Sequence, residues 1–169
     1  KNGTTLGTSS QLAVNSNGSY VVKITDSHGC FGTITSSPVI FNPLPIATIS
    51  GSTVVCEGAV SPALQLLGSN GTAPYTFTYQ INSGNDITKN AGENAINVPT
   101  NDAGTFTYNL KGVTDAIGCY QAIVDNETVL VNPLPTISIG AINPISRAAT
   151  NVSLPYSSTS NNPTYFAVS

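Results

Sequence analysis

Three cysteines are the residues of this sequence that could form covalent cross-links. Cys30 and Cys119 each end an Asp-x-x-Gly-Cys segment and lie 89 residues apart, while Cys56 follows the apolar run Val54-Val55. The simplest pairing joins Cys56 to Cys119, which leaves Cys30 to pair with a cysteine upstream of Lys1. Such bridges imply an oxidising compartment. A metal site is the alternative, but the sequence contains no Cys-x-x-Cys pair or histidine cluster to support it.

One histidine and several turn aspartates are the remaining candidates for polar chemistry. His28 could act as a base, but no serine or cysteine nucleophile with a supporting motif accompanies it, so a solvated turn residue is favoured. Asp26, Asp86, Asp102 and Asp115 could bind Ca²⁺, which takes roughly six to eight oxygen ligands. Their sparse spacing favours ordinary aspartate turns instead. We therefore expect no catalytic residue, no metal site and no cofactor.

Aromatic side chains offer a carbohydrate-binding alternative. Tyr75, Phe77 and Tyr79 alternate with threonine, which places the three rings on one face of a half-buried strand. Core packing is therefore favoured over sugar stacking for these rings. The roles of Tyr120 and Tyr165 stay open.

A repeated phrase divides the chain into modules. Asn42-Pro43-Leu44-Pro45 recurs 90 residues later as Asn132-Pro133-Leu134-Pro135, and each copy lies between two apolar, strand-like runs. A fixed period of this size indicates a tandem array. The two prolines fix φ and remove two backbone donors, so each phrase predicts a short, stiff, extended connector. Leu44 and Leu134 are expected to plug the junctions.

This period predicts three segments. Residues 1–43 are expected to form the C-terminal part of one module, residues 44–132 a complete module, and residues 133–169 the N-terminal part of a third. Lys1 and Ser169 both fall inside modules in this frame, so we expect the chain to be an excerpt of a longer protein.

Short strand patterns separated by turn residues predict an all-β fold with seven strands in the complete module, as in a two-sheet sandwich. A break is expected within the last strand. The expected strands are Ile46–Ser50, Thr53–Cys56, Ala63–Leu67, Tyr75–Ile81, Ala95–Val98, Thr105–Gly112 and Cys119–Val131. In the flanking segments the expected strands are Ser19–Asp26, Phe31–Phe41, Asn151–Tyr156 and Thr164–Ser169.

The composition restricts the classes of partner. Charged residues make up 8% of the chain and the net charge is −3, so there is no basic face for nucleic acid. No apolar run reaches the ~20 residues of a membrane span. Thr, Ser, Asn and Gly supply the polar positions instead, a mixture typical of extracellular β proteins.

Three segments can be compared with a known family: Gly18–Cys30, the Asn-Pro-Leu-Pro phrase with Val54-Val55-Cys56 after it, and Gly71–Tyr79. They resemble the immunoglobulin-like and PKD-like repeats of very large surface adhesins of gliding Bacteroidota. The resemblance covers residues 1–140 well and the rest weakly. It implies tandem immunoglobulin-like sandwiches of about 90 residues, joined by Pro-rich connectors and exported by type IX secretion.

One corner of that fold can be placed on the sequence. Asn101–Phe106 and Asn17–Tyr20 resemble the Asp-x-Gly-x-Tyr corner, whose ring packs inward and whose tyrosine hydroxyl bonds to nearby backbone. Phe106 lacks that hydroxyl, so only packing is expected there. The core cysteine of immunoglobulin domains would fall at Val22 and Tyr108, so that disulfide is absent.

The function predicted from these features is structural. We expect a disulfide-stabilised stalk in a long cell-surface or secreted adhesin that serves adhesion or gliding motility, and not an enzyme. Neighbouring modules, surface glycans or other adhesin chains are the expected partners, without nucleic acid or membrane insertion. An array of carbohydrate-binding or spacer modules attached to a secreted enzyme is the alternative.

Overall fold

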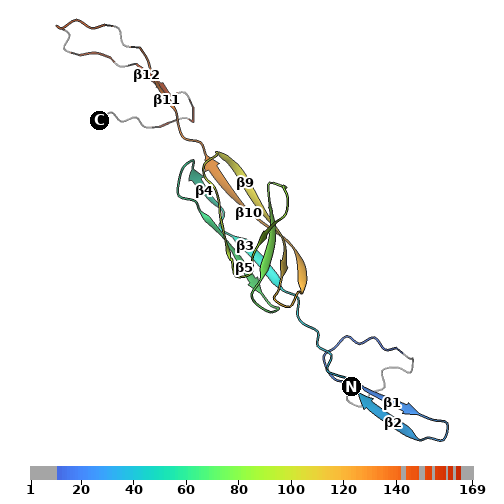
Figure 1. Cartoon of the computed structure of the whole chain (residues 1–169). Helices are drawn as coiled ribbons and strands as arrows, with labels where there is room; N and C mark the ends of the chain where they lie inside the picture. The colour runs from blue at the N-terminus through green and yellow to red at the C-terminus, as the bar shows by residue number, and fades with distance from the viewer. Residues whose placement is uncertain are drawn as a thin grey trace. The chain divides into compact units, whose positions relative to one another are not determined.

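The computed structural model describes residues 11–141, 144–148, 151–153, 155–158, 160–161 and 163–164. Every helix or strand assigned in these ranges is a strand, so the fold is all-β as predicted (Figure 1). None of these elements is a helix long and apolar enough to cross a membrane. The contacts divide the chain into two units, Lys1–Leu44 and Pro45–Ser169.

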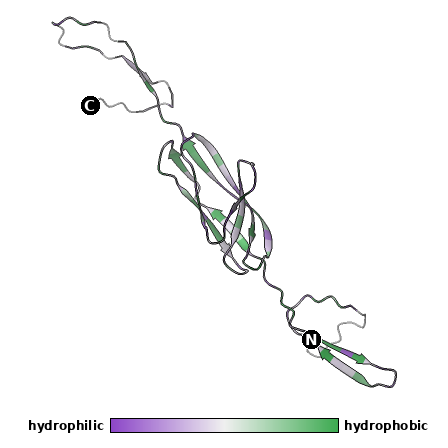
Figure 2. Ribbon diagram, in the orientation of Figure 1, coloured by the Kyte–Doolittle hydropathy of each residue, from purple (hydrophilic) through white to green (hydrophobic). Residues whose placement is uncertain are grey.

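The first unit contains one antiparallel hairpin of β1 (Val21–Thr25) and β2 (Phe31–Thr35). An isolated bridge between Gly18 and Val39 extends the pairing. Both strands are shorter than the predicted Ser19–Asp26 and Phe31–Phe41. Apolar residues in both strands lie exposed to solvent. Figure 2 marks the hydrophobic stretches of this hairpin in green.

The predicted corner at Tyr20 is confirmed. Its hydroxyl donates a hydrogen bond to the carbonyl of Ser16 at 2.6 Å, and the ring is half-buried. Asn17 adds a second fixed point, because its side-chain oxygen accepts a hydrogen bond from the amide of Phe41 at 2.6 Å. In the second unit Phe106 packs against the core, which is the role expected of a ring without a hydroxyl.

The second unit contains two sheets that share one core. A three-stranded sheet has the order β3-β5-β8, and a five-stranded sheet has the order β4-β10-β9-β6-β7. All pairs are antiparallel except β4 with β10, which are parallel. The strands are β3 (Ile46–Ser50), β4 (Thr53–Cys56), β5 (Ala63–Ser69), β6 (Thr76–Ile81), β7 (Ile87–Lys89), β8 (Ala95–Asn97), β9 (Gly104–Thr114) and β10 (Tyr120–Asn132).

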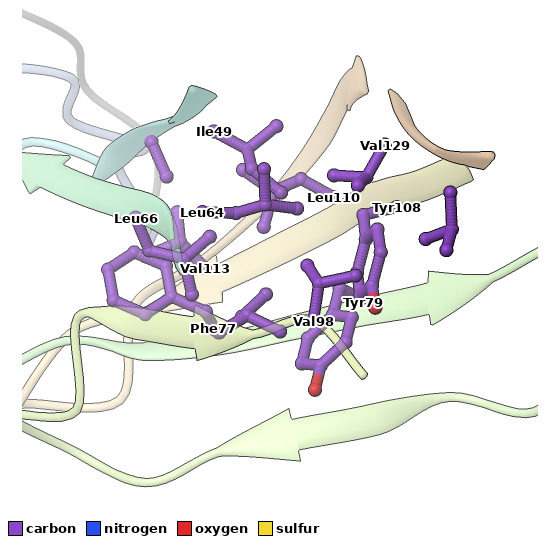
Figure 3. Close-up of a cluster of buried hydrophobic side chains, with 13 residues drawn as sticks. Ile49, Leu64, Leu66, Phe77, Tyr79, Val98, Tyr108, Leu110, Val113 and Val129 are labelled. Atoms are coloured by element: carbon purple, nitrogen blue, oxygen red, sulfur yellow. The ribbon is translucent and has the colours of Figure 1, made fainter. Parts of the chain in front are cut away.

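Alternating residues produce the two faces of these sheets. In β3 the side chains of Ala47 and Ile49 are buried while their neighbours are exposed, and β5 buries Leu64 and Leu66 in the same way. A strand places successive side chains on opposite faces, so alternation gives each sheet one apolar face. These faces meet in the cluster of Figure 3, which consists of Ala47, Ile49, Leu64, Leu66, Phe77, Tyr79, Ile96, Val98, Tyr108, Leu110, Val113, Val129 and Val131.

The chain changes sheets between β3 and β4. Gly51 has a φ of 120°, and a side chain there would stand 3.2 Å from the carbonyl oxygen of Ala63. Glycine tolerates both constraints because it has no Cβ. After the switch, Ser52 donates a side-chain hydrogen bond to Glu127 and accepts one from the amide of Thr128 at 3.1 Å, which attaches the start of β4 to β10.

The predicted break in the last strand is a register shift. The pairing of β10 with β9 slips between Ala122 and Asp125, and Val124 is fully exposed there. Asp125 turns inward to the other sheet, where it accepts a hydrogen bond from the amide of Ile49 at 3.1 Å. The bulge therefore orients one carboxylate so that it links the two sheets.

Most predicted strands of the complete module are confirmed, and two have the predicted bounds, β3 and β4. Strand β7 was missed, because its three residues, Ile-Thr-Lys, lie in a polar, turn-rich stretch. Beyond the module, β11 (Ile137–Ile139) pairs with β12 (Tyr156–Ser158). The described part of the predicted strand Asn151–Tyr156 is irregular up to Pro155, and most of Thr164–Ser169 lies outside the described residues.

The division between Leu44 and Pro45 falls inside the first Asn-Pro-Leu-Pro phrase. The second phrase has no such division, so the boundary expected after Asn132 stays a prediction. Pro45 is fully buried in the second unit, whereas Leu44 and Leu134 are about half exposed. Pro45 is thus the inward-facing residue of the first phrase within the second unit, and the junction role of the two leucines stays a prediction.

Leu64 and Leu67 lie on opposite faces of β5 and provide a matched test of the core. Leu64 has 0% and Leu67 has 68% of its surface exposed. We expect Leu64→Ala to lower the free energy of unfolding by about 2–5 kcal/mol, because it removes buried methyl groups and leaves a cavity. Leu67→Ala should change it by no more than about 0.5 kcal/mol. Urea unfolding followed by far-ultraviolet circular dichroism measures both, and equal losses would contradict this sheet arrangement.

Candidate functional site

Asp115, at the turn between β9 and β10, is a buried polar side chain that accepts three hydrogen bonds from backbone amides. Its side chain is 95% buried, with 5% of its surface exposed. One carboxylate oxygen, Oδ1, accepts hydrogen bonds from the amides of Ile117 at 3.1 Å and Cys119 at 2.8 Å. The amide of Asp115 donates to the carbonyl of Cys119 at 3.0 Å, so the carboxylate and the backbone close the turn together.

The second oxygen of Asp115 holds a distant loop. Oδ2 accepts a hydrogen bond from the amide of Thr72 at 3.0 Å, and the carbonyl of Thr72 accepts one from the amide of Ala116 at 2.8 Å. Gly71 precedes this contact with a φ of 57°, and a Cβ there would stand 2.7 Å from Oδ2. A glycine is therefore required for the loop before β6 to approach the turn of the β9–β10 hairpin.

The pKa of Asp115 reflects two opposing effects. Burial raises the pKa, since it disfavours the charged carboxylate. Hydrogen bonds from the backbone amides of Thr72, Cys119, Ile117 and Gly118 stabilise the charged form, and they lower the pKa by more than burial raises it. The net pKa lies below the ordinary value of an aspartate. Asp115 is consequently a charged anchor of the turn.

The first unit repeats this turn at Asp26. The carboxylate Oδ1 accepts hydrogen bonds from the amides of His28 at 2.9 Å and Cys30 at 2.8 Å. The amide of Asp26 donates to the carbonyl of Cys30 at 2.9 Å, and Gly29 has the same φ of 86° as Gly118. The turns are thus built alike, which agrees with the predicted aspartate-turn role.

His28 is an exposed member of that turn. The ring nitrogen Nδ1 lies 3.4 Å from the hydroxyl of Ser27, and Asp26 binds the backbone amide of His28 and not its ring. Among the described residues no carboxylate is hydrogen-bonded to the imidazole, and a base acting on a serine would need such a partner to orient it. Asp86 and Asp102 are also exposed and lie in separate loops, and the described ranges contain no group of three metal-ligating side chains.

The predicted disulfide between Cys56 and Cys119 is wrong. No two of the three cysteines are bonded to each other. Cys56 pairs with Asn132 at the end of β10, whereas Cys119 immediately precedes the first residue of that strand. At about 3.3 Å per residue, these cysteines lie roughly 40 Å apart. A disulfide requires Cα atoms within about 7 Å. The pairing of Cys30 with a cysteine outside this sequence stays a prediction.

The core role of Phe77 and Tyr79 is confirmed (Figure 3). Tyr75 is partly buried and packs against the same core. Tyr79 stacks on Tyr108, with ring centroids 6.2 Å apart. A buried tyrosine therefore stands at position 108, where the core cysteine of an immunoglobulin domain would fall. Burial raises the pKa of both hydroxyls. Tyr120 is half exposed, and its ring lies against Gly112 of the neighbouring strand. Tyr165 lies outside the described residues.

A surface hollow lies beside the β10 bulge. Polar side chains dominate its lining, which includes Gln80, Asn109, Lys111 and Asn126. None of its lining residues is aromatic, so it lacks the flat apolar platform on which a sugar ring would stack. This hollow gives the carbohydrate-binding alternative no specific support.

Sequence reasoning placed Asp115 correctly in a turn but missed its bond to Thr72. The signal that was available is the recurrence of Asp-x-x-Gly-Cys at residues 26–30 and 115–119. Recurrence at both hairpin turns indicated a structural requirement for the carboxylate. It could not identify the loop that the second carboxylate oxygen binds.

Replacing Asp115 should make stability less dependent on pH. The unfolded carboxylate takes up protons at a higher pH than the folded one, so its contribution is complete above the unfolded pKa of about 4 and is lost as pH falls through the lower folded pKa. Asp115→Asn places an amide donor against the amide of Thr72 or the turn. Its deficit in stability relative to the wild type should therefore be largest near neutral pH and shrink below pH ~4.

Urea unfolding at a series of pH values measures this difference. Asp102→Asn is the matched control, because it removes the same charge from an exposed loop without touching the turn. A constant deficit for Asp115→Asn across the whole pH range would contradict the anchoring role.

The cysteines provide a separate test. Alkylation of the unreduced, unfolded monomer after air oxidation should add a label to Cys30, Cys56 and Cys119, since none has an intramolecular partner. Intact-mass and peptide mass spectrometry give the count. A monomer with Cys56 linked to Cys119 would contradict the strand order of the five-stranded sheet.

Comparison with known proteins gives no family to which these features can be attached. No protein-family model matches the chain, and no curated protein matches it.

Proposed function

We propose that the chain is a segment of a long, repetitive extracellular adhesin or surface filament, in which immunoglobulin-like sandwiches of about 90 residues form a non-catalytic stalk. The observation that carries the proposal is the shared turn at Asp26 and Asp115. Two turns with the same hydrogen bonds, 89 residues apart, support a tandem array of one module type.

The strand order of the second unit supports the immunoglobulin-like part of the proposal. Sandwiches of that class pack two mainly antiparallel sheets over one core, and the β3-β5-β8 and β4-β10-β9-β6-β7 sheets have this arrangement. Stability of the stalk then comes from the core and the aspartate turns instead of an internal disulfide.

The polar surface chemistry supports an extracellular stalk. Few charges, many threonines and asparagines, and no described metal-binding group leave little for catalysis. The resemblance to repeats of gliding Bacteroidota supports export by type IX secretion and a role in adhesion or gliding. Neighbouring modules are the first partners, joined through the Asn-Pro-Leu-Pro phrases as short extended connectors.

An antibody raised against this chain tests the proposed location and role together. It should label intact, unpermeabilised cells of the source organism, and its monovalent fragments should reduce attachment of those cells to glass. Fragments from non-immune serum are the control. Labelling that appears only after permeabilisation would contradict a surface stalk.

A further inference from the structure

The hairpin of the first unit has an uncovered apolar face. Ile24 precedes the Asp26 turn at the same distance as Val113 precedes the Asp115 turn, 89 residues later. Ile24 has 74% of its surface exposed, whereas Val113 has 0%. Among the described residues, β1 pairs with β2 alone. A two-stranded hairpin is marginal in water, and its free edge is a template for another strand.

The second unit shows what covers the same position. Strand β6 pairs antiparallel with β9 and places Phe77 opposite Val113 and Thr76 opposite Thr114. The loop before β6 reaches the turn through the Thr72 amide and the Asp115 Oδ2 atom. One continuous segment thus supplies a strand, a buried ring and a hydrogen bond to the turn.

The first unit has the groups that would make these three contacts, but no described segment binds them. Asp26 Oδ1 is occupied by two turn amides, as in Asp115, but Oδ2 accepts no hydrogen bond from any described residue. The outer edge of β1 is unpaired in the described chain, and Ile24 projects from this strand. A charged acceptor, a strand edge and an apolar side chain therefore stand in a fixed arrangement.

We propose that the outer edge of β1, with Asp26 Oδ2 and Ile24, is a docking site for a β-segment of this chain's own repeat type, an Asn-Gly-Thr loop followed by an aromatic–threonine strand like Gly68–Ile81. The threonine amide of the loop donates to Oδ2, and the position of Phe77 lies opposite Ile24. This is strand addition, in which backbone hydrogen bonds provide affinity and side-chain pockets provide selectivity. It rests on the repeat part of the proposed function and not on the proposed location.

A synthetic peptide with the sequence of residues 68–81 tests this site on the full chain. Hydrogen–deuterium exchange should slow at Val21–Thr25 when the peptide is added. Asp26→Asn keeps an acceptor for the turn amides but can present a donor at the second position, so it should weaken peptide binding about tenfold. A peptide with Thr72→Pro, which lacks the amide that binds Oδ2, should bind the wild-type chain more weakly by a similar factor.

Fusing residues 45–98 ahead of Lys1 through a Gly/Ser linker provides a second measurement, because the linker raises the effective concentration to the millimolar range. The fusion should add a second cooperative unfolding transition, and Asp26→Asn should lower its midpoint. The proposal would be overturned if hydrogen–deuterium exchange at β1 slowed neither with the added peptide nor in the fusion, or if exchange slowed at β9 alone. Surface labelling by the antibody would be unaffected by that result, so the two failures are distinguishable.

Discussion

The β9–β10 hairpin is the constraint on which the second unit depends. Every other strand of the five-stranded sheet pairs with it directly or through β6, and its inner face supplies much of the core. The Asp115 carboxylate fixes the hairpin's turn and, through Thr72, the loop that leads into β6. A single buried carboxylate therefore fixes both the local turn and the position of a loop 43 residues earlier, which leads into β6.

The two units show one turn in two environments. In the second unit Asp115 is buried and bonded to the loop at Thr72, and the adjoining apolar residue Val113 is inside the core. In the first unit the turn keeps its geometry while Ile24 is exposed. The turn is thus determined by its own Asp-x-x-Gly-Cys sequence, whereas burial of the neighbouring strand depends on the segments that pair with it.

Local patterns explain why most strands could be predicted. Alternation in Ile46–Ser50 and the turn residues Gly51-Ser52 determine β3 and the start of β4 within a few residues. The cysteine pairing failed because spacing along the chain does not reveal which strand ends are neighbours. The parallel pairing of β4 with β10 decides that question. The bond between Asp115 and Thr72 was missed for the same reason, since it depends on the tertiary arrangement of two distant loops.

The parallel pairing of β4 with β10 also has a mechanical consequence. The chain enters this sandwich at Ile46 and leaves it at Asn132, next to the end of β4 (Figure 1). Tension along the chain pulls the two parallel strands in opposite directions, so the backbone hydrogen bonds between Thr53–Cys56 and Val129–Asn132 are loaded in shear. Bonds loaded in this way share the force and break together instead of peeling apart one by one. The topology that separates the cysteines thereby makes this short ladder a mechanical clamp.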